Sequence, residues 1–134
     1  MKSIILILGD QVSKNISSLK AIDKKNDLIL MCEVFEECST PKHHKKKIVF
    51  ILSAMRHFAQ ELQGEGYNVC YVKLDDEENT GSFKSEVLRI SQNHQINKVK
   101  VTHPGEYRVL QDLLSLKDEN IDLALIGEGE LAFL

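Results

Sequence analysis

The sequence lacks any apolar run of the length that crosses a bilayer, which takes roughly 18 to 20 residues. Its first apolar run, Ser3 to Leu8, meets a Gly-Asp pair instead of a small-residue cleavage site, so we expect no secretory leader. Without such a leader, an odd number of cysteines favours reduced thiols over a disulfide framework. The three cysteines are Cys32, Cys38 and Cys70. These absences predict a cytoplasmic protein with no membrane partner.

An excess of positive charge is also missing. Seventeen basic and twenty acidic residues give a formal net charge of −3, so we expect no direct binding of nucleic acid by this chain. Apolar residues make up 43% and charged residues 28%, which is typical of a globular protein. A chain of 134 residues can bury roughly two thirds of its unfolded surface, which predicts a single domain over residues 1–134.

Short apolar runs alternate along the chain with amphipathic stretches. The runs typical of buried strands are Ser3 to Leu8, Asp27 to Val34, Tyr67 to Leu74, Lys98 to Thr102 and Ile121 to Ile126. The stretches with helical spacing are a weak one at Ile16 to Ile22, then Ile48 to Leu62, Phe83 to Ile90 and Tyr107 to Leu114. Gly64 and Gly66 are expected to end the long helix, and Pro104 suits a first helical position.

This alternation predicts an α/β fold: a Rossmann-like three-layer sandwich in which a five-stranded parallel sheet carries helices on both faces. In such sheets, ligands bind outside the carboxyl ends of the strands, where the strand order reverses. The segments that follow Leu8, Val34, Leu74 and Thr102 are therefore the candidate sites.

The segment after the first strand gathers polar groups beside a glycine. Gly9 allows close backbone approach, and Asp10, Gln11 and Ser13 bring an acceptor, an amide and a hydroxyl. Neither a glycine-rich dinucleotide fingerprint nor a phosphate-binding Gly-Lys-Ser/Thr pattern occurs in the chain. The segment is either part of a ligand site or a strand-to-helix turn with an aspartate cap.

The segment after the second strand combines glutamates with a basic run. Glu33, Glu36 and Glu37 precede a run of lysines and histidines, residues 42–47, that opens the longest helix. Each exposed cation at a helix start costs roughly 0.3 to 1 kcal/mol, because that end of the helix dipole is already positive. Solvent and the neighbouring glutamates can offset this cost, or an anionic or polyhydroxylated ligand can do so.

Metal and nucleophile chemistry find little support. Two cysteines and two histidines fall between Cys32 and His44, but Cys32 lies inside an apolar strand and no Cys-x-x-Cys pair exists, so we expect no metal. No serine or cysteine has an identifiable base partner, and we predict no catalytic residue in this chain.

Several segments, in this order and spacing, resemble a known family. They are Gly9-Asp10-Gln11-Val12-Ser13, Glu33-Val34 with Glu37, His44-Lys45-Lys46-Lys47-Ile48, Leu52-Ser53-Ala54-Met55-Arg56-His57-Phe58-Ala59, Leu74-Asp75-Asp76, Asn79-Thr80-Gly81-Ser82-Phe83 and Pro104-Gly105-Glu106. Together they resemble the amino-terminal domain of the deoxyribodipyrimidine photolyase-related proteins, the prokaryotic iron–sulfur photolyase and cryptochrome group. The resemblance covers nearly the whole chain, and its most specific block is Leu52 to Phe58.

The resemblance implies a light-harvesting role. Full-length members carry this α/β domain in front of a helical domain that binds FAD and an iron–sulfur cluster, and they act as (6-4) photolyases in DNA repair or as blue-light receptors. The α/β domain holds an antenna chromophore, 6,7-dimethyl-8-ribityllumazine. The helical domain and the cluster ligands are absent from these 134 residues, so we expect an excised or truncated chain that cannot repair DNA alone.

The resemblance also implies which residues hold the chromophore. They are Gly9, Asp10, Gln11, Ser13 and Glu37 after the first two strands, with His44, Lys47, Ile51 and Met55 on or near the facing helix. Ile51 and Met55 are one turn apart and could contact the ring faces, while the polar residues could bind the ring edge and the ribityl chain.

Two other functions stay open at the level of the sequence. One is a stand-alone Rossmann-like protein that binds a nucleotide or a flavin-type molecule in the same crevice, although the glycine-rich loops for phosphates are missing. The other is an interaction domain without a ligand. The retained polar residues Asp10, Gln11 and Glu37 favour the chromophore over this last reading.

Overall fold

The structure, a computed structural model, describes residues 3–8, 22–33, 45–79, 81–104, 107–127 and 130–132. For residues 45–49, 127 and 130–132 it describes the backbone course and not the side chains. The strands are β1 Ser3–Leu6, β2 Asp27–Cys32, β3 Asn68–Val72, β4 Lys98–Thr102, β5 Asp122–Gly127 and β6 Glu130–Ala132. The helices are α3 Lys45–Gly64, α4 Phe83–His94 and α5 Tyr107–Leu114, followed by the 3-10 turn η1 Ser115–Glu119.

All five predicted strands and the three stronger predicted helices are confirmed at their expected places. The long helix ends at Gly64, as expected, and Gly66 follows with φ of 93°. Pro104 was expected inside the third helix and lies before it instead, because α5 begins only at Tyr107. The weak helix expected from residue 16 falls almost wholly outside the described residues.

The sheet has the order β3-β2-β1-β4-β5-β6, and its first five strands are all parallel. The strand order therefore reverses between β1 and β4, which is the switch point of a doubly wound sheet. The sixth strand, β6, was not expected and pairs antiparallel with β5. At three residues it is too short to show a period in the sequence.

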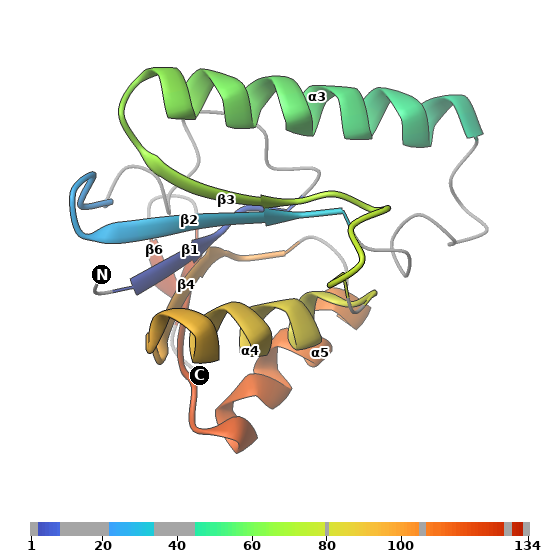
Figure 1. The fold of residues 1–134 in the computed structure, drawn as a ribbon. Helices are drawn as coiled ribbons and strands as arrows, with labels where there is room; N and C mark the ends of the chain where they lie inside the picture. The colour runs from blue at the N-terminus through green and yellow to red at the C-terminus, as the bar shows by residue number, and fades with distance from the viewer. Residues whose placement is uncertain are drawn as a thin grey trace.

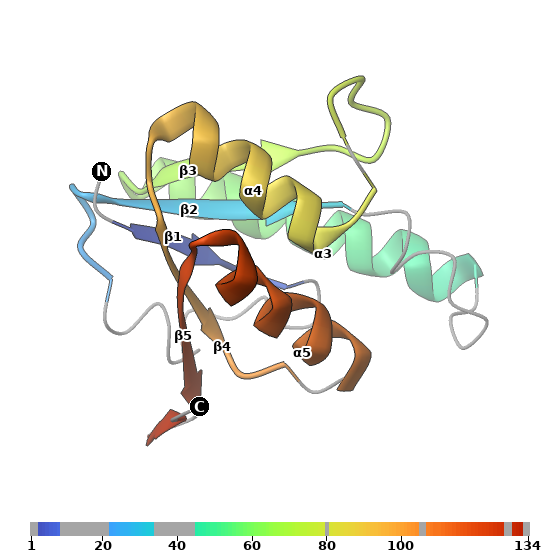
Figure 2. The ribbon, with the colours of Figure 1, turned by 90° about the horizontal axis from the view of Figure 1, so that it is seen from below.

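The helices cover both faces of the sheet (Figure 1). Helix α3 lies on one face, and α4 and α5 lie together on the other, as the view from below also shows (Figure 2). Alternate residues of β1 divide between the two cores: Ile5 packs with Met55 and Phe58 of α3, whereas Ile4 packs with Val87 and the rest of the α4 and α5 side. A strand buried on both faces has to be apolar throughout, which explains the continuous run that predicted it.

Local backbone rules set the ends of α4. Ser82 caps its start, accepting a hydrogen bond from Ser85 N at 3.2 Å. Its end is closed by Gln95 in the left-handed conformation, with φ of 57°, and the backbone N–H groups of Gln95 and Ile96 both donate to Ser91 O. Asn120, with φ of 63°, ends η1 in the same way just before β5.

No helix in the described parts of the chain is long and apolar enough to cross a membrane. Cys32 is buried inside β2 and Cys70 is half-buried in β3, and neither forms a disulfide. Cys38 falls among the residues that the structure does not describe.

Candidate functional site

The residues that the sequence places in a ligand site fall into three groups. Outside the described residues lie Gly9, Asp10, Gln11, Ser13, Glu37 and His44. Lys47 lies in the first turn of α3, where the structure describes the backbone alone. Ile51 and Met55 lie one turn apart on the side of α3 that packs against β1 and β2. Met55 is only 2% exposed, whereas Ile51 is half-buried and lies at the margin of that core.

A buried carboxylate lies at the carboxyl end of β2, next to this helix. Glu33 follows the last residue of β2 and its side chain has no exposed surface. Its Oε2 accepts a hydrogen bond from Arg56 Nε at 2.6 Å, and its Oε1 accepts one from Arg56 Nη2 at 2.8 Å. This two-pronged geometry is the strongest form of a pairing between a guanidinium and a carboxylate.

Two further donors complete the shell of this carboxylate. The Tyr71 hydroxyl, on β3, donates to Oε2, and Leu74 N, just past the end of β3, donates to Oε1 at 2.9 Å. Four donors on one buried glutamate satisfy the condition under which a buried charge is tolerated. We call Glu33, Arg56 and Tyr71 the Glu33 cluster.

The backbone around Glu33 is held as firmly as its side chain. Its N–H donates to Val72 O at 2.9 Å, and its carbonyl accepts from Asn79 Nδ2 at 2.6 Å. The same amide donates to Lys73 O at 2.9 Å, while Asn79 Oδ1 accepts from Gly81 N at 2.8 Å. One asparagine therefore joins the end of β2 to the turn that leads from β3 into α4.

The charge states in the Glu33 cluster follow from these contacts. Burial alone would raise the pKa of Glu33, but the hydrogen bonds from Arg56, Tyr71 and Leu74 N and the charge of Arg56 together lower it. The hydrogen bond to Glu33 raises the pKa of Arg56. Burial raises the pKa of Tyr71, and the bond to Glu33 raises it further. Near neutral pH the cluster is a carboxylate, a guanidinium and a neutral phenol.

Sequence reasoning placed Glu33 among the glutamates before the basic run and in a matching segment, and named Arg56 in another matching segment. It did not pair them with each other or with Tyr71. Two signals could have found the cluster. A glutamate directly after a fully apolar strand needs a buried partner, and Arg56 lies directly after Met55 on the helix that covers that strand. Neither signal identifies Tyr71, because only the pairing of β2 with β3 brings it near.

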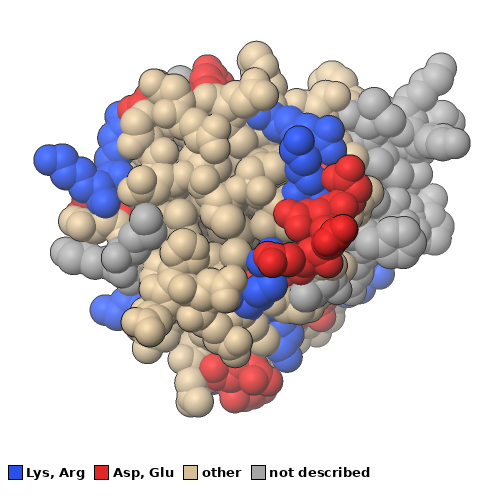
Figure 3. All heavy atoms as spheres, in the orientation of Figure 1, with Lys and Arg blue, Asp and Glu red and all other residues tan. Residues whose placement is uncertain are grey.

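The turn after β3 presents a group of exposed carboxylates. Asp75 to Glu78 are all exposed, and Figure 3 shows acidic side chains gathered on one side of this face beside lysines and arginines. Asp76 Oδ1 accepts from Glu78 N at 3.0 Å, which is an ordinary turn contact. The group is a solvated turn at the carboxyl edge of the sheet.

A second buried glutamate lies on the opposite face of the sheet. Glu86 of α4 is fully buried and accepts from Arg89 Nη2 at 2.6 Å and Arg89 Nε at 3.3 Å. Arg89 also bonds the exposed Glu78 at 3.1 Å. The hydrogen bond to Glu86 raises the pKa of Arg89, and burial raises the pKa of the nearby Cys70 thiol. The Glu86–Arg89 pair spans three positions of α4, and Arg89 links it to the turn after β3 through Glu78.

The carboxyl end of β4 adds a histidine at the switch point. His103 N donates to Ile126 O at 2.8 Å, and its Nδ1 lies 3.0 Å from Pro104 O, within hydrogen-bond distance. Its ring is therefore engaged with the backbone beside it. Tyr107, at the start of α5, is 76% exposed.

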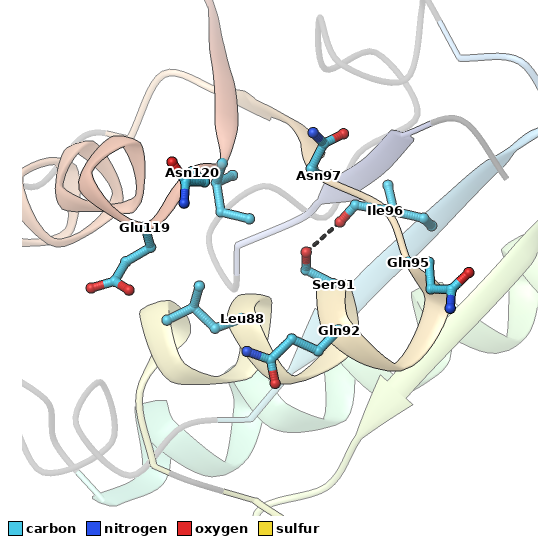
Figure 4. Close-up of a pocket in the computed structure, with 9 residues that line it drawn as sticks. Leu88, Ser91, Gln92, Gln95, Ile96, Asn97, Glu119 and Asn120 are labelled. Carbon is cyan, nitrogen blue, oxygen red and sulfur yellow. Dashed lines mark hydrogen bonds between the residues drawn. The ribbon is translucent and has the colours of Figure 1, made fainter.

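A hollow of about 360 Å³ opens at the other edge of the sheet, where β4 and β5 begin. Its lining residues are Leu88, Ser91, Gln92, Gln95, Ile96, Asn97, Glu119, Asn120 and Ile121. Figure 4 shows the Ser91 hydroxyl bonded to Ile96 O, while the side chains of Gln95, Asn97 and Glu119 point away from one another. Ligand sites need polar groups that converge, and this hollow has none.

Comparisons with known proteins agree with this architecture. The family model described as deoxyribodipyrimidine photo-lyase-related protein matches residues 5–131. A protein of Agrobacterium fabrum described as (6-4) photolyase is 52% identical over 113 residues, which is 84% of this chain and 22% of that protein. The chain thus spans about a fifth of that relative.

A solved structure shares the fold at low sequence identity. A protein of the universal stress protein family from Burkholderia pseudomallei superposes with a TM-score of 0.51 at 16% identity, covering 92% of this chain and 94% of that one. A likeness at this identity establishes the Rossmann-type α/β fold alone.

Proposed function

Because this chain belongs to the deoxyribodipyrimidine photolyase-related family, we propose that it is an antenna domain that binds 6,7-dimethyl-8-ribityllumazine. The observation that carries the proposal is the family match over residues 5–131 together with 52% identity to a (6-4) photolyase. In this role the domain absorbs light and passes the excitation to a flavin, for DNA photorepair or for blue-light sensing. No covalent chemistry is required of its residues.

The described part of the proposed site suits the ring of such a ligand. A lumazine ring needs apolar contact on its faces and a few fixed polar groups at its edge. Ile51 is half-buried at the margin of the core under α3, and Met55 lies one turn further into it. We propose that Ile51 and Met55 contact the ring.

The polar part of the proposed site comes from the segments after β1 and β2. We propose that Gly9, Asp10, Gln11 and Glu37 lie around the ring edge, and that Ser13, Glu37, His44 and Lys47 bind the ribityl chain or lie beside it. Support comes from the topology, since β1 lies at the switch point and β2 is its parallel neighbour, so both strands end at the edge where such folds bind ligands.

The partners follow from the length of the relative. This chain corresponds to 22% of the (6-4) photolyase it matches, so FAD, an iron–sulfur cluster and the repair reaction belong in our proposal to a helical domain outside these 134 residues. We expect this domain to contact that partner and not DNA, in keeping with the net charge of −3. That neither Cys32 nor Cys70 forms a disulfide fits the reducing, cytoplasmic location that we propose.

The direct experiment is thermal unfolding of the purified chain with lumazine added. A ligand that binds only the native state stabilises it, by about 2.7 kcal/mol when its concentration is 100 times Kd. We expect a rise in Tm with 6,7-dimethyl-8-ribityllumazine and none with AMP or FMN at the same concentration. A rise with AMP or FMN alone would instead favour a nucleotide-binding or flavin-binding protein, and no rise with any of them would leave a ligand-free domain.

A pair of neighbouring substitutions tests where the ring lies. Ile51→Trp should fill the ring site and weaken lumazine binding by at least about tenfold, roughly 1.4 kcal/mol, as measured by fluorescence titration. Phe50→Trp is the matched control, because Phe50 is 74% exposed on the same turn of α3 and should leave the affinity unchanged. Equal affinities of the two variants and the wild type would show that the ligand does not contact this face of α3.

A further inference from the structure

The Glu33 cluster joins the end of β2 to α3, the helix that carries the proposed ring contacts Ile51 and Met55. Glu33 is followed directly by Val34 and the segment that carries Glu37. Arg56 follows Met55 on α3, and Ile51 lies one turn earlier. The Glu33–Arg56 ion pair therefore connects the end of β2 directly with the helix that carries Ile51 and Met55.

We propose that Glu33 is a positioning residue for the chromophore, acting through Arg56 on the face of α3 that carries Ile51 and Met55. This inference rests on the proposed function, because it assigns the residues that set the geometry of that same site. Arg56 and Tyr71 share the role, since both hold the Glu33 carboxylate.

The first step of the argument concerns the placement of α3. A guanidinium that bonds both oxygens of one carboxylate has a defined orientation as well as a defined distance, so the pair favours one placement of α3 over the end of β2. Binding constellations have to be held to within about 0.5 Å by supporting residues. The Glu33–Arg56 pair is such a support for Ile51 and Met55, which occupy the same helix.

The second step concerns the point at which the chain leaves β2. The Glu33 N–H is held by Val72 O and its carbonyl by the Asn79 amide, so the backbone is tied on both sides just before Val34. Leu74 N, bonded to the carboxylate, ties the turn after β3 to the same residue. Loss of the carboxylate would remove its bonds to α3 and to this turn together.

The competing interpretation is that the cluster only stabilises the fold. Buried ion pairs often contribute little net stability compared with apolar residues of similar volume, so stability is a weak reason for keeping one. The two interpretations differ in one respect. A purely stabilising pair affects ligand affinity only through the fraction of folded protein, whereas a positioning pair changes the affinity of protein that is fully folded.

The experiment compares matched changes on the two faces of the sheet. Glu33→Gln and Glu86→Gln each remove the charge of one buried glutamate that is bonded by an arginine. Both variants are titrated with 6,7-dimethyl-8-ribityllumazine at a temperature where circular dichroism shows them folded, and the emission spectrum of the bound ligand is recorded.

We expect Glu33→Gln to weaken lumazine binding by about tenfold and to shift the emission of the bound ligand. Tenfold is the lower end of the loss in affinity that follows when residues supporting the ligands of a metal site are replaced. Glu86→Gln should change the affinity by less than about twofold, because Glu86 lies on α4, on the face of the sheet opposite α3 (Figure 1). Tyr71→Phe keeps the ring and removes one bond to Glu33, so it should weaken binding by a smaller factor, and it replaces Glu33→Gln should that variant fail to fold.

Each outcome decides one question. Equal affinity and equal emission in wild type, Glu33→Gln and Tyr71→Phe would overturn the positioning role and leave the antenna proposal standing. Equal weakening by Glu33→Gln and Glu86→Gln would also overturn it, because the effect would then not depend on the face. A wild-type chain that does not bind lumazine would overturn the antenna proposal and this inference with it.

Discussion

Two buried glutamates of this protein, Glu33 and Glu86, each pair with an arginine, but at very different separations in the sequence. Glu33 and Arg56 are 23 positions apart and, with Tyr71 and Leu74 N, join a helix, two strands and a turn. Glu86 and Arg89 are three positions apart on one helix. The Glu33–Arg56 pair therefore connects a helix with a strand end 23 positions away, whereas the Glu86–Arg89 pair spans three positions of α4 and reaches the turn after β3 only through the exposed Glu78. The residue types are the same in both pairs, so the separation of the partners in the sequence decides which elements each pair connects.

The largest expected effect comes from deleting the long-range partner. Glu33→Ala leaves the Tyr71 hydroxyl and Leu74 N without their acceptor, so we expect the free energy of unfolding to fall by about 3 kcal/mol. This is the low end of the range for a broken buried pair, because the Arg56 side chain is 46% exposed and can be hydrated again. Urea unfolding followed by circular dichroism measures the loss.

Glu86→Ala is the control for that deletion. Its cost should be smaller, about 1 to 2 kcal/mol, because Arg89 keeps its contact with Glu78. If Glu86→Ala lowered the free energy of unfolding by as much as Glu33→Ala or more, the long-range pair would contribute no more stability than the local one.

Acid provides a second test of the long-range pair. The pKa of Glu33 is lowered in the folded protein, so its ionised form contributes stability above the unfolded-state pKa, ordinarily 4.5. That contribution should be lost as the pH falls below this value and down through the lowered pKa of the folded state. Glu33→Gln cannot titrate and should show a shallower fall in unfolding free energy over this window. The same slope in both proteins would mean that Glu33 does not contribute to the acid response.

The smallest expected effect lies on the local side of the comparison and has the opposite sign. Gln95 closes α4 in the left-handed conformation, which costs a residue with a side chain more than it costs glycine. Gln95→Gly should therefore stabilise the protein, by up to about 1 kcal/mol, measured as a rise in Tm. Ser85→Gly, inside the same helix, should destabilise it by a similar amount. Stabilisation by both variants would show that the end of α4 is not governed by local backbone rules.

Much of the fold could be predicted because its signals are local. A strand covered by helices on both faces is apolar along most of its length, so β1 and β2 appeared as continuous apolar runs after their first residues, Ser3 and Asp27. The repeat of apolar residues through Met55 and Phe58 predicted α3 and the face that it buries. Strand β6 could not be found in this way, since three residues have no measurable period.

The candidate site could be predicted only in part. The topology confirms a switch point between β1 and β4, and the proposed ring contacts Ile51 and Met55 share the sheet-facing side of α3. Residues such as Asp10 and Glu37 fall outside the described parts of the chain, and their roles stay predictions. The cluster around Glu33 was missed because no periodicity connects a strand end to a helix 23 positions away.

The amino-acid sequence by itself determined the class of this protein: its five parallel strands, its three described helices and its membership of the photolyase-related family follow from patterns within short stretches. Only the tertiary structure decided which charges meet. Apolar burial depends on each residue's own surface and leaves a periodic trace, whereas Glu33, Arg56 and Tyr71 come together only when β2, α3 and β3 have all assembled.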